Sequence, residues 1–393
     1  MYDFSISASR EKTNAEKYTL RKKLFGTEDI LPVWVADMDI DTPSFVFEDI
    51  KKRLEHPILG YEMVPSSAYE AQIQWMKNNH NVEFKIDDMI YSHSVVASIN
   101  VAIEAYTNEG DNIIVQTPVY PPFFQSVKRH NRELLENKLV IKENGKYGLD
   151  LEDLKSKINE KTKLLLLCSP HNPVGRVWDK EELSELLEIC IKNNIVVFSD
   201  EIHSDLVFSP NKHISFSSLN ENAKDICVTA MGVGKTFNLA GVSMSSVAIS
   251  NEELKEKFLK VYEQNHFADG SVLSHVAFQS AYTHGQVWLD ELKVHLYKNY
   301  EMLKQLCEKY PTLVKLTPTE ATYLAWIDCR GMNLGDKKLR DFFVKEAKLG
   351  LNPGLGFGSN GSGFMRLNFA VSLEKMKEVI SRLDRALEKK EKV

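Results

Sequence analysis

The feature that most constrains the fold is a series of short apolar runs, separated by stretches in which apolar residues recur at helical spacing. Four such runs occupy residues 112–115, 163–167, 195–198 and 226–229. Their continuous apolar character is typical of strands buried on both faces. Because helices connect them, we expect right-handed crossovers and a mostly parallel sheet in an α/β fold. Ligands bind such sheets beyond the carboxyl ends of the strands, so the residues after each run are the functional candidates.

The intervening stretches carry helix start signals. Asp179 is followed three residues later by Glu182 and then by leucines at helical spacing, which predicts a capping box. Asp150 and Ser372 are the expected N-caps of two further helices. A chain of 393 residues with this pattern fits one large domain with a smaller satellite, or two comparable domains.

Composition excludes several classes of protein. The net charge is -6, from 49 basic and 55 acidic residues spread along the chain, so we expect no nucleic-acid partner. Five cysteines, odd in number, widely spaced and without a Cys-x-x-Cys pair, indicate reduced thiols rather than disulfides or structural zinc. The histidines lack metal-ligand spacing, so no metal is assigned. No apolar run reaches membrane-spanning length, which predicts a cytoplasmic protein with no membrane contact.

Four side chains follow the four apolar runs: Tyr120, Asn172, Asp200 and Lys235. Each alone has an ordinary alternative, as a packed ring, a turn, a helix cap or a solvated loop lysine. Together they match the needs of pyridoxal 5'-phosphate. An aromatic face stacks on the cofactor ring, an amide donates to its phenolate, a carboxylate keeps the pyridine nitrogen protonated, and an amine holds the aldehyde.

The motifs around these residues carry a family resemblance. Asn172-Pro-x-Gly175, Ser199-Asp-Glu201 and Lys235-Thr-Phe-Asn238, in this order, resemble the class I/II aminotransferase family of fold type I pyridoxal-phosphate enzymes. Residues 31–39 (Leu-Pro-Val-Trp-Val-Ala-Asp-Met-Asp), together with Gly60-Tyr61, look like the cystathionine β-lyase and C–S lyase branch (MalY/PatB type).

The resemblance implies an architecture as well as a family. We expect a large cofactor-binding domain over residues 46–285, with a mostly parallel sheet of the seven-stranded type. A smaller α+β domain is expected over 286–393, joined by an N-terminal arm, 1–45.

The resemblance also assigns cofactor contacts. Lys235 would hold the aldehyde and move the substrate Cα proton, with Asp200 on the pyridine nitrogen, Asn172 on the 3'-oxygen and Tyr120 on the ring face. His203 is a candidate for the floor of the site, with a packed, hydrogen-bonded histidine as the alternative.

Backbone amides of Ser94, Val95 and Val96 match the family turn that holds the phosphate, a task that suits a helix N-terminus. Tyr61 is similar to the tyrosine that reaches the phosphate of a neighbouring subunit, so the resemblance implies a homodimer with shared active sites.

The amino-acid substrate would be held by Arg366, whose planar fork suits an α-carboxylate. Ala36 and Asp37 would lie near the substrate entrance, with the Ala36 backbone as a second carboxylate contact.

The chain departs from the family pattern at three positions. Gly232 and Gly234 stand where serine or threonine usually binds the phosphate, and Ser243 stands in place of an arginine that aminotransferases usually carry. Fewer phosphate ligands put cofactor affinity in question, and Ser243 or Ser245 could compensate.

The resemblance favours α,β-elimination on cystathionine- or cysteine-type amino acids, giving a thiol, pyruvate and ammonia. Two alternatives stay open. A class I/II aminotransferase shares every step up to removal of the Cα proton, and a regulatory protein could keep the fold without efficient turnover. The thioether that is used is left open.

Overall fold

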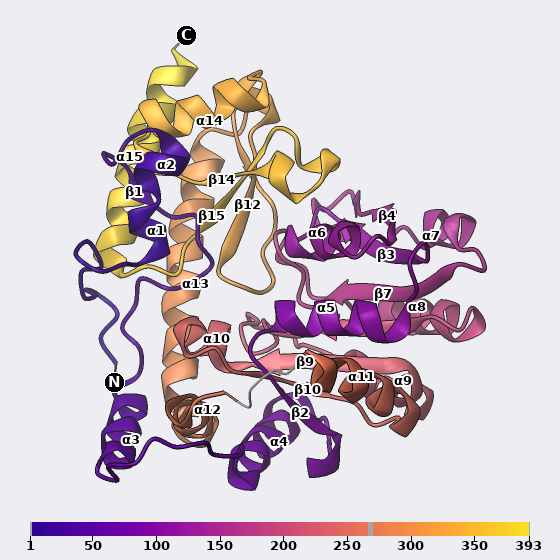
Figure 1. Cartoon of the computed structure of the whole chain (residues 1–393). Helices are drawn as coiled ribbons and strands as arrows, with labels where there is room; N and C mark the ends of the chain where they lie inside the picture. The colour runs from indigo at the N-terminus through magenta and orange to yellow at the C-terminus, as the bar shows by residue number, and fades with distance from the viewer. Residues whose placement is uncertain (1, 266–269, 393) are drawn as a thin grey trace.

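A computed structural model describes residues 2–265 and 270–392 of the protein. Its centre is a seven-stranded sheet with the order β2-β10-β9-β8-β7-β3-β4 (Figure 1). Strand β10 is antiparallel to β2 and β9, and the pairs from β9 to β4 are parallel. The predicted mostly parallel sheet is therefore confirmed. The strands are β2 (Met89–Ser92), β3 (Asn112–Thr117), β4 (Glu133–Lys138), β7 (Thr162–Cys168), β8 (Val196–Asp200), β9 (Cys227–Gly232) and β10 (Ser245–Ala248).

Each of the four predicted apolar runs overlaps one of these strands, but the strands extend further at their carboxyl ends. Asp200 is thus the last residue of β8 and pairs with Cys168 of β7, rather than lying in the following loop. Backbone pairing does not depend on side-chain polarity, so the end of an apolar run underestimates the end of its strand.

Strand β7 shows why the runs are continuously apolar. Leu164 and Leu166 belong to the core that contains helix α5 (Val95–Tyr106), whereas Leu165 and Leu167 belong to the core that contains helix α8 (Lys180–Lys192). Successive side chains point to opposite faces, so a strand covered on both sides needs apolar residues throughout.

The predicted helix starts are present. The Asp179 carboxylate accepts the Glu182 N–H at 3.0 Å in a reciprocal capping box at the start of α8. Asp150 caps α7 (Leu151–Lys157) and Ser372 caps α15 (Leu373–Glu391) in the same way. Each such cap stabilises a helix by about 1 kcal/mol.

Further helices surround the sheet or connect it to the C-terminal part. These are α3 (Ser44–Leu54), α4 (Ser66–His80), α6 (Pro122–Arg129), α9 (Glu221–Ile226), α10 (Val233–Thr236), α11 (Glu252–Gln264), α12 (Val272–His284) and α13 (Gln286–Lys309). Across residues 2–265 and 270–392, no helix combines the length and the apolar character that a membrane crossing requires.

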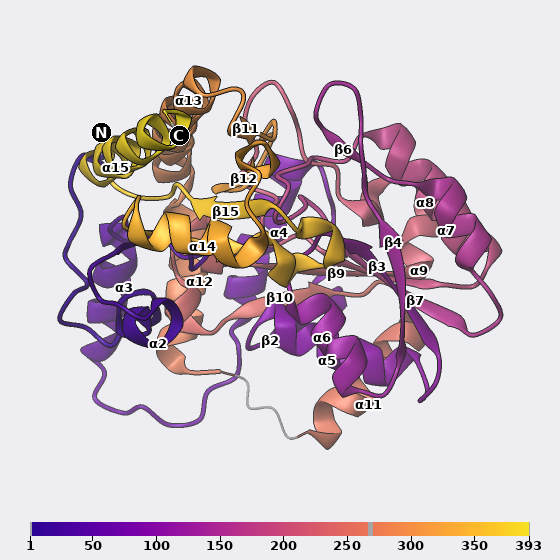
Figure 2. The ribbon, with the colours of Figure 1, turned by 90° about the horizontal axis from the view of Figure 1, so that it is seen from above.

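The C-terminal part is built on a four-stranded antiparallel sheet, packed beside α13, α14 and α15 (Figures 1 and 2). Its strands and remaining helix are β11 (Lys315–Leu316), β12 (Leu324–Asp328), β14 (Asn352–Pro353), β15 (Phe364–Asn368) and α14 (Asp336–Lys345). The N-terminal arm, which carries α1 (Glu16–Thr19) and α2 (Arg21–Phe25), joins this part because β1 (Leu31–Pro32) pairs with β13 (Leu349–Gly350). Two short strands, β5 (Val140–Ile141) and β6 (Tyr147–Gly148), form a separate hairpin.

Candidate active site

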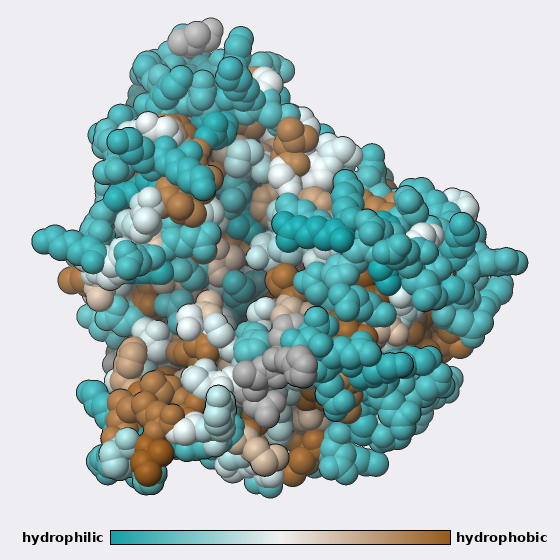
Figure 3. Space-filling view, viewed as in Figure 1, coloured by the Kyte–Doolittle hydropathy of each residue, from teal (hydrophilic) through white to brown (hydrophobic). Residues whose placement is uncertain are grey.

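The side chains predicted at the strand ends meet in one cavity at the carboxyl edge of the large sheet. Of the predicted site residues, those that line it are Ala36, Ser94, Val95, Val96, Tyr120, Asn172, Asp200, His203 and Lys235. Arg366 and Asp37 line an adjoining pocket that shares Ala36, Tyr120 and Lys235 with the first. Figure 3 shows the surface recessed between the C-terminal part and the part that carries the large sheet. Among the predicted site residues, Tyr61 lines neither pocket.

Lys235 lies in the short helix α10, directly after strand β9. Its Nζ donates to the Ala36 carbonyl at 2.7 Å. Burial, with the nearby Arg366 guanidinium, lowers the pKa of Lys235 to about 8, although Asp37 and Asp200 act in the opposite direction. With this pKa roughly a tenth of the amine is unprotonated at pH 7, far more than for an ordinary lysine, and this is the form that an aldehyde-binding lysine requires.

Asp200 is buried at the end of β8, where its carboxylate accepts the Ile202 N–H at 3.1 Å. Burial raises its pKa to about 7, and no side chain in the described part of the chain forms an ion pair with it. A buried carboxylate without a counter-ion is unfavourable. A ligand that brings a protonated ring nitrogen would supply the missing cationic donor.

Arg366 is 4% exposed on strand β15, so a surface salt bridge does not account for it. Its guanidinium donates to Asn172 Oδ1 at 3.1 Å, to the Trp34 carbonyl at 2.9 Å and to Asn352 Oδ1 at 2.8 Å. Its Nε has no partner, and among the described residues no carboxylate pairs with it. Burial lowers the pKa of Arg366 to about 10. The group is a buried cation suited to an anion from outside the chain.

Asn172 and Tyr120 lie side by side at the same edge. Because Asn172 Oδ1 accepts from Arg366, its Nδ2 is the amide atom that can donate toward the cavity. The Tyr120 N–H donates to the Asn172 carbonyl at 3.1 Å, and its half-buried ring borders both pockets. This arrangement offers a ring face and an amide donor to one flat ligand.

The predicted phosphate turn is the N-terminus of α5. Ser94 is its N-cap, with Oγ accepting the Ala97 N–H at 3.1 Å. The N–H groups of Val95 and Val96, in the first turn, have no intrahelical acceptor and suit a phosphate. Ser243 and Ser245 also line the cavity, but the Ser245 hydroxyl already donates to the Ser92 carbonyl at 3.1 Å.

The two glycines that replace family phosphate ligands differ in their surroundings. Gly232 pairs with Ser245 across β9 and β10, and a Cβ at Gly232 would lie 2.9 Å from the Ser245 Cβ. A Cβ at Gly234 would meet the Ala240 Cα at 3.5 Å, an ordinary contact distance. Packing therefore requires the first glycine but leaves room for a side chain at the second.

His203 is buried in the cavity wall, with its ring edge-on to Tyr323 at a centroid distance of 5.9 Å. Its Nδ1 has no hydrogen-bond partner in the described part of the chain, and burial holds its pKa well below the usual value. The neutral ring lies in the cavity wall with its Nδ1 unpaired among the described residues, and its role at the site floor stays a prediction. Tyr323, whose hydroxyl donates to the Ala36 carbonyl at 2.9 Å, was missed because nothing around it in the sequence marks it.

Tyr61 is fully exposed on the connection between α3 and α4, together with Ile58, Leu59 and Met63. Figure 3 shows apolar surface in the region of α3, at the lower left. Clustered exposed apolar side chains are typical of an interaction surface.

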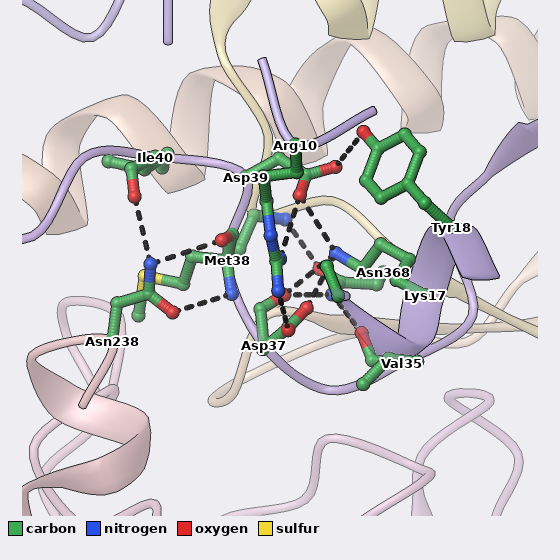
Figure 4. Close-up of polar contacts among 12 residues, drawn as sticks. Arg10, Lys17, Tyr18, Val35, Asp37, Met38, Asp39, Ile40, Asn238 and Asn368 are labelled. Carbon is green, nitrogen blue, oxygen red and sulfur yellow. Dashed lines mark hydrogen bonds and ion pairs between the residues drawn. The ribbon is translucent and has the colours of Figure 1, made fainter. Parts of the chain in front are cut away.

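Asp37 is engaged by cations of the N-terminal arm (Figure 4). Its carboxylate pairs with Arg10 at 2.8 Å and with Lys17 at 2.8 Å, and Lys17 is completely buried. Asp39 next to it pairs with the same two residues and with Lys375. This cluster, which no local sequence pattern marks, ties Arg10 and Lys17 to the loop before α3, and the role of Asp37 near the substrate entrance stays a prediction.

Comparisons with known proteins identify the family of the chain. Residues 39–383 match the profile of the family described as aminotransferase class I and II. The chain is 36% identical to the cystathionine beta-lyase PatB of Bacillus subtilis (strain 168) over 386 residues, covering 98% of this chain and 100% of PatB. It is similar to cystalysin from Treponema denticola, whose crystal structure contains pyridoxal 5'-phosphate, with a TM-score of 0.95, 33% identity and 99% of each chain covered. It is also similar to the PLP-bound C–S lyase from Staphylococcus hominis, with a TM-score of 0.90, 33% identity and 98% of each chain covered.

Proposed function

Because the chain belongs to the aminotransferase class I and II family, we propose that it is a pyridoxal-phosphate-dependent carbon–sulfur lyase. It would act on cystathionine- or cysteine-type amino acids and release a thiol, pyruvate and ammonia. The observation that carries the proposal is that Lys235, with a pKa of about 8, shares one cavity with the buried Asp200 and the adjoining pocket with the buried Arg366. The similarity to PatB and to the C–S lyase from Staphylococcus hominis supports the lyase branch.

The chain fits pyridoxal 5'-phosphate as its cofactor. Lys235 would hold the aldehyde, Asp200 the ring nitrogen, Asn172 the 3'-oxygen and Tyr120 the ring face, with the first-turn amides of α5 on the phosphate. When bound, this cofactor captures the substrate amine and withdraws electrons from Cα. The unpaired carboxylate of Asp200 supports this fit, because the ring nitrogen brings the cation that the site lacks.

The protein side chains supply the remaining chemistry. Arg366 would orient the substrate through its α-carboxylate, with two guanidinium nitrogens fixed by Trp34, Asn172 and Asn352. Lys235 would accept the Cα proton, since an amine with a pKa near the working pH is an effective general base. The sulfur would then leave Cβ as a thiolate, carrying the electron pair of the broken C–S bond.

The substrate pocket disfavours a dicarboxylate aminotransferase. Among the described residues that line it, the cationic side chains are Lys235 and Arg366, and both already have roles. The distal carboxylate of such a substrate would instead meet Glu16 and the ion-paired Asp37 in the pocket wall, whereas the distal end of cystathionine also carries an ammonium group that suits these carboxylates. Like charges repel, so aspartate-type substrates should bind weakly.

We further propose a homodimer in which Tyr61 serves the phosphate of the partner subunit. In a single chain Tyr61 is fully exposed and away from its own site, among other exposed apolar side chains, which supports this role. We also propose the division into a large domain, 46–285, and a small domain, 286–393, completed by the arm, 1–45. The separate seven-stranded and four-stranded sheets support this division.

The test is to incubate the purified protein with cystathionine, with and without an added 2-oxo acid, and to measure pyruvate, thiol and new amino acid separately. We expect equal amounts of pyruvate and thiol without the oxo acid. Lys235→Ala should abolish both products, whereas Lys257→Ala, at an exposed helix position, should not. Turnover that depends on the oxo acid and releases no thiol would leave the aminotransferase alternative.

A further inference from the structure

The loop between β1 and α3 is held through its backbone carbonyl groups as well as through the carboxylates of Asp37 and Asp39. Every carbonyl from residue 34 to residue 40 accepts a hydrogen bond, and the donors come from distant parts of the chain. They are Arg366 for Trp34, Asn368 for Val35, Lys235 and Tyr323 for Ala36, Lys17 and Asn368 for Asp37, Asn238 for Met38, Ser372 for Asp39, and Asn238 for Ile40. The loop is therefore shaped by the segments that carry Lys235 and Arg366.

Asn238 makes the largest set of these contacts on the lysine side. Its Oδ1 accepts the Met38 N–H at 2.9 Å, and its Nδ2 donates to the carbonyls of Met38 at 3.0 Å and Ile40 at 2.8 Å (Figure 4). The Thr42 hydroxyl donates to the Asn238 carbonyl at 3.3 Å. The side-chain amide thus uses both of its N–H donors and its oxygen to bind the backbone of the loop.

Asn238 and Lys235 are close in sequence and bind neighbouring residues of the same loop. The two residues are three apart, and the Lys235 Nζ contacts Ala36, two residues before Met38. The chain segments 235–238 and 36–38 are therefore joined at both ends, by the hydrogen bond from Lys235 to Ala36 and by those between Asn238 and Met38. Asn238 therefore holds the loop two residues away from the carbonyl that the Lys235 amine contacts.

We propose that Asn238 is a positioning residue for Lys235, which acts by fixing the Ala36 carbonyl that aims the lysine amine. The proposal rests on the proposed function, in which Lys235 takes up the substrate Cα proton. Asn238 itself lines neither of the two pockets of the site. Its loss should leave the protein folded and the cofactor attached but should slow proton transfer, because small displacements of a general base strongly reduce its rate.

The variant must remove the side chain without straining the backbone. Asn238 has a φ of 55°, in the left-handed region, so Asn238→Gly deletes the amide and keeps the conformation accessible. Asn333 is the matched control: its φ is 53°, it is exposed, and it lies at the end of the 3-10 turn Arg330–Met332. Asn333→Gly makes the same chemical change at the same backbone conformation outside the site.

The first readout is hydrogen–deuterium exchange of the Met38 amide, in the apoprotein and the holoenzyme. This N–H donates to Asn238 Oδ1, so its exchange should accelerate at least tenfold in Asn238→Gly and stay unchanged in Asn333→Gly. The second readout is exchange of the substrate Cα proton in D2O, followed by NMR and expressed per bound cofactor. We expect at least a tenfold loss in Asn238→Gly, with the cofactor content of the control.

Asn238→Asp provides a second variant if the glycine variant does not fold. It keeps the acceptor for Met38 but puts a carboxylate beside the carbonyls of Met38 and Ile40, so Cα exchange should fall as well. Normal Cα exchange in a folded variant at Asn238 would overturn the positioning role, as would an unchanged Met38 amide in Asn238→Gly. If the wild-type protein exchanged no Cα proton from any amino acid, the proposed function itself would fail, which is a separate result.

Discussion

Replacing Gly234 by serine should tighten cofactor binding, because it restores a phosphate ligand that the family usually carries. The added Cβ would meet the Ala240 Cα at 3.5 Å and the Ala240 nitrogen at 3.7 Å, so the backbone need not move. Gly234 lines the same cavity as Ser94, the N-cap of the helix whose amides would hold the phosphate. A serine hydroxyl at this position could donate to a phosphate oxygen.

The size of the effect follows from one hydrogen bond to a charged acceptor. Such a bond contributes about 1.5–3 kcal/mol. With about 1.4 kcal/mol for each factor of ten, the dissociation constant of the cofactor should fall roughly 10- to 100-fold. Serine is also a better helix former than glycine by less than about 1 kcal/mol, which affects stability but not the contact with the phosphate.

Gly232→Ser is the matched control, because it adds the same side chain where there is no room. Its Cβ would lie 2.9 Å from the Ser245 Cβ and 3.1 Å from the Ser245 Cα, in the paired strand. Overpacking of this kind destabilises by about 1–3 kcal/mol. We therefore expect weaker cofactor retention and a lower free energy of unfolding.

The assay is equilibrium dialysis of each apoprotein against pyridoxal 5'-phosphate, with bound cofactor read from its visible absorbance, alongside urea unfolding of the apoproteins. The two serine variants should change affinity in opposite directions. If Gly234→Ser bound the cofactor no more tightly than the wild type, or if Gly232→Ser were tolerated without loss of stability, the account of the two glycines would be wrong.

Three further predictions follow from the same structure. The pKa of Asp200 in the folded apoprotein, about 7, lies above its value in the unfolded chain. The folded state therefore keeps a proton that the unfolded chain loses, and the free energy of unfolding falls as the pH rises from about 4 to 7. In thermal unfolding, Asp200→Asn should be more stable than the wild type at pH 8, with a smaller difference near pH 4. Lys17→Met breaks a buried ion-pair cluster and should lower the free energy of unfolding in urea by about 3–5 kcal/mol. Lys257→Met removes an exposed i,i+4 ion pair and should lower it by about 0.3–0.5 kcal/mol. Equal losses in the two variants would contradict the burial argument. Mixing inactive Tyr61→Phe with inactive Lys235→Ala should restore part of the lyase activity if the sites are shared, and no recovery despite demonstrated subunit exchange would count against the dimer.

The sequence predicted the scaffold well because its signals are local. Continuous apolar runs mark doubly covered strands, and the Asp179–Glu182 pair marks a helix start within four residues. The resemblance rested on motifs that are contiguous in sequence, and the family that they predict is confirmed. The end of β8 was misjudged by two residues, since ladder pairing continues through polar side chains such as Ser199 and Asp200.

The sequence could not predict the support around the site, because that support is made of long-range pairs. Lys375 reaches Asp39 across 336 residues, and no local pattern indicates such a contact. Asn238 lies within a quoted motif and Asn368 lies two residues after Arg366, yet the partners of both are backbone carbonyls, which every residue carries. When the partner is a backbone carbonyl, the residue type at that position can be anything, so the sequence does not identify the contact.

The hydrogen bonds of the loop at residues 34–40 also determine when this loop can fold during synthesis of the chain. This segment leaves the ribosome early, but most of the donors that shape it lie at residue 235 or beyond, and three lie between residues 366 and 372. The large sheet, whose strands end at Ala248, can form before those last donors exist. We therefore expect a nascent chain with a complete sheet and an unformed substrate entrance, so the newly made protein becomes competent for catalysis only when its C-terminal strand and helix have been added.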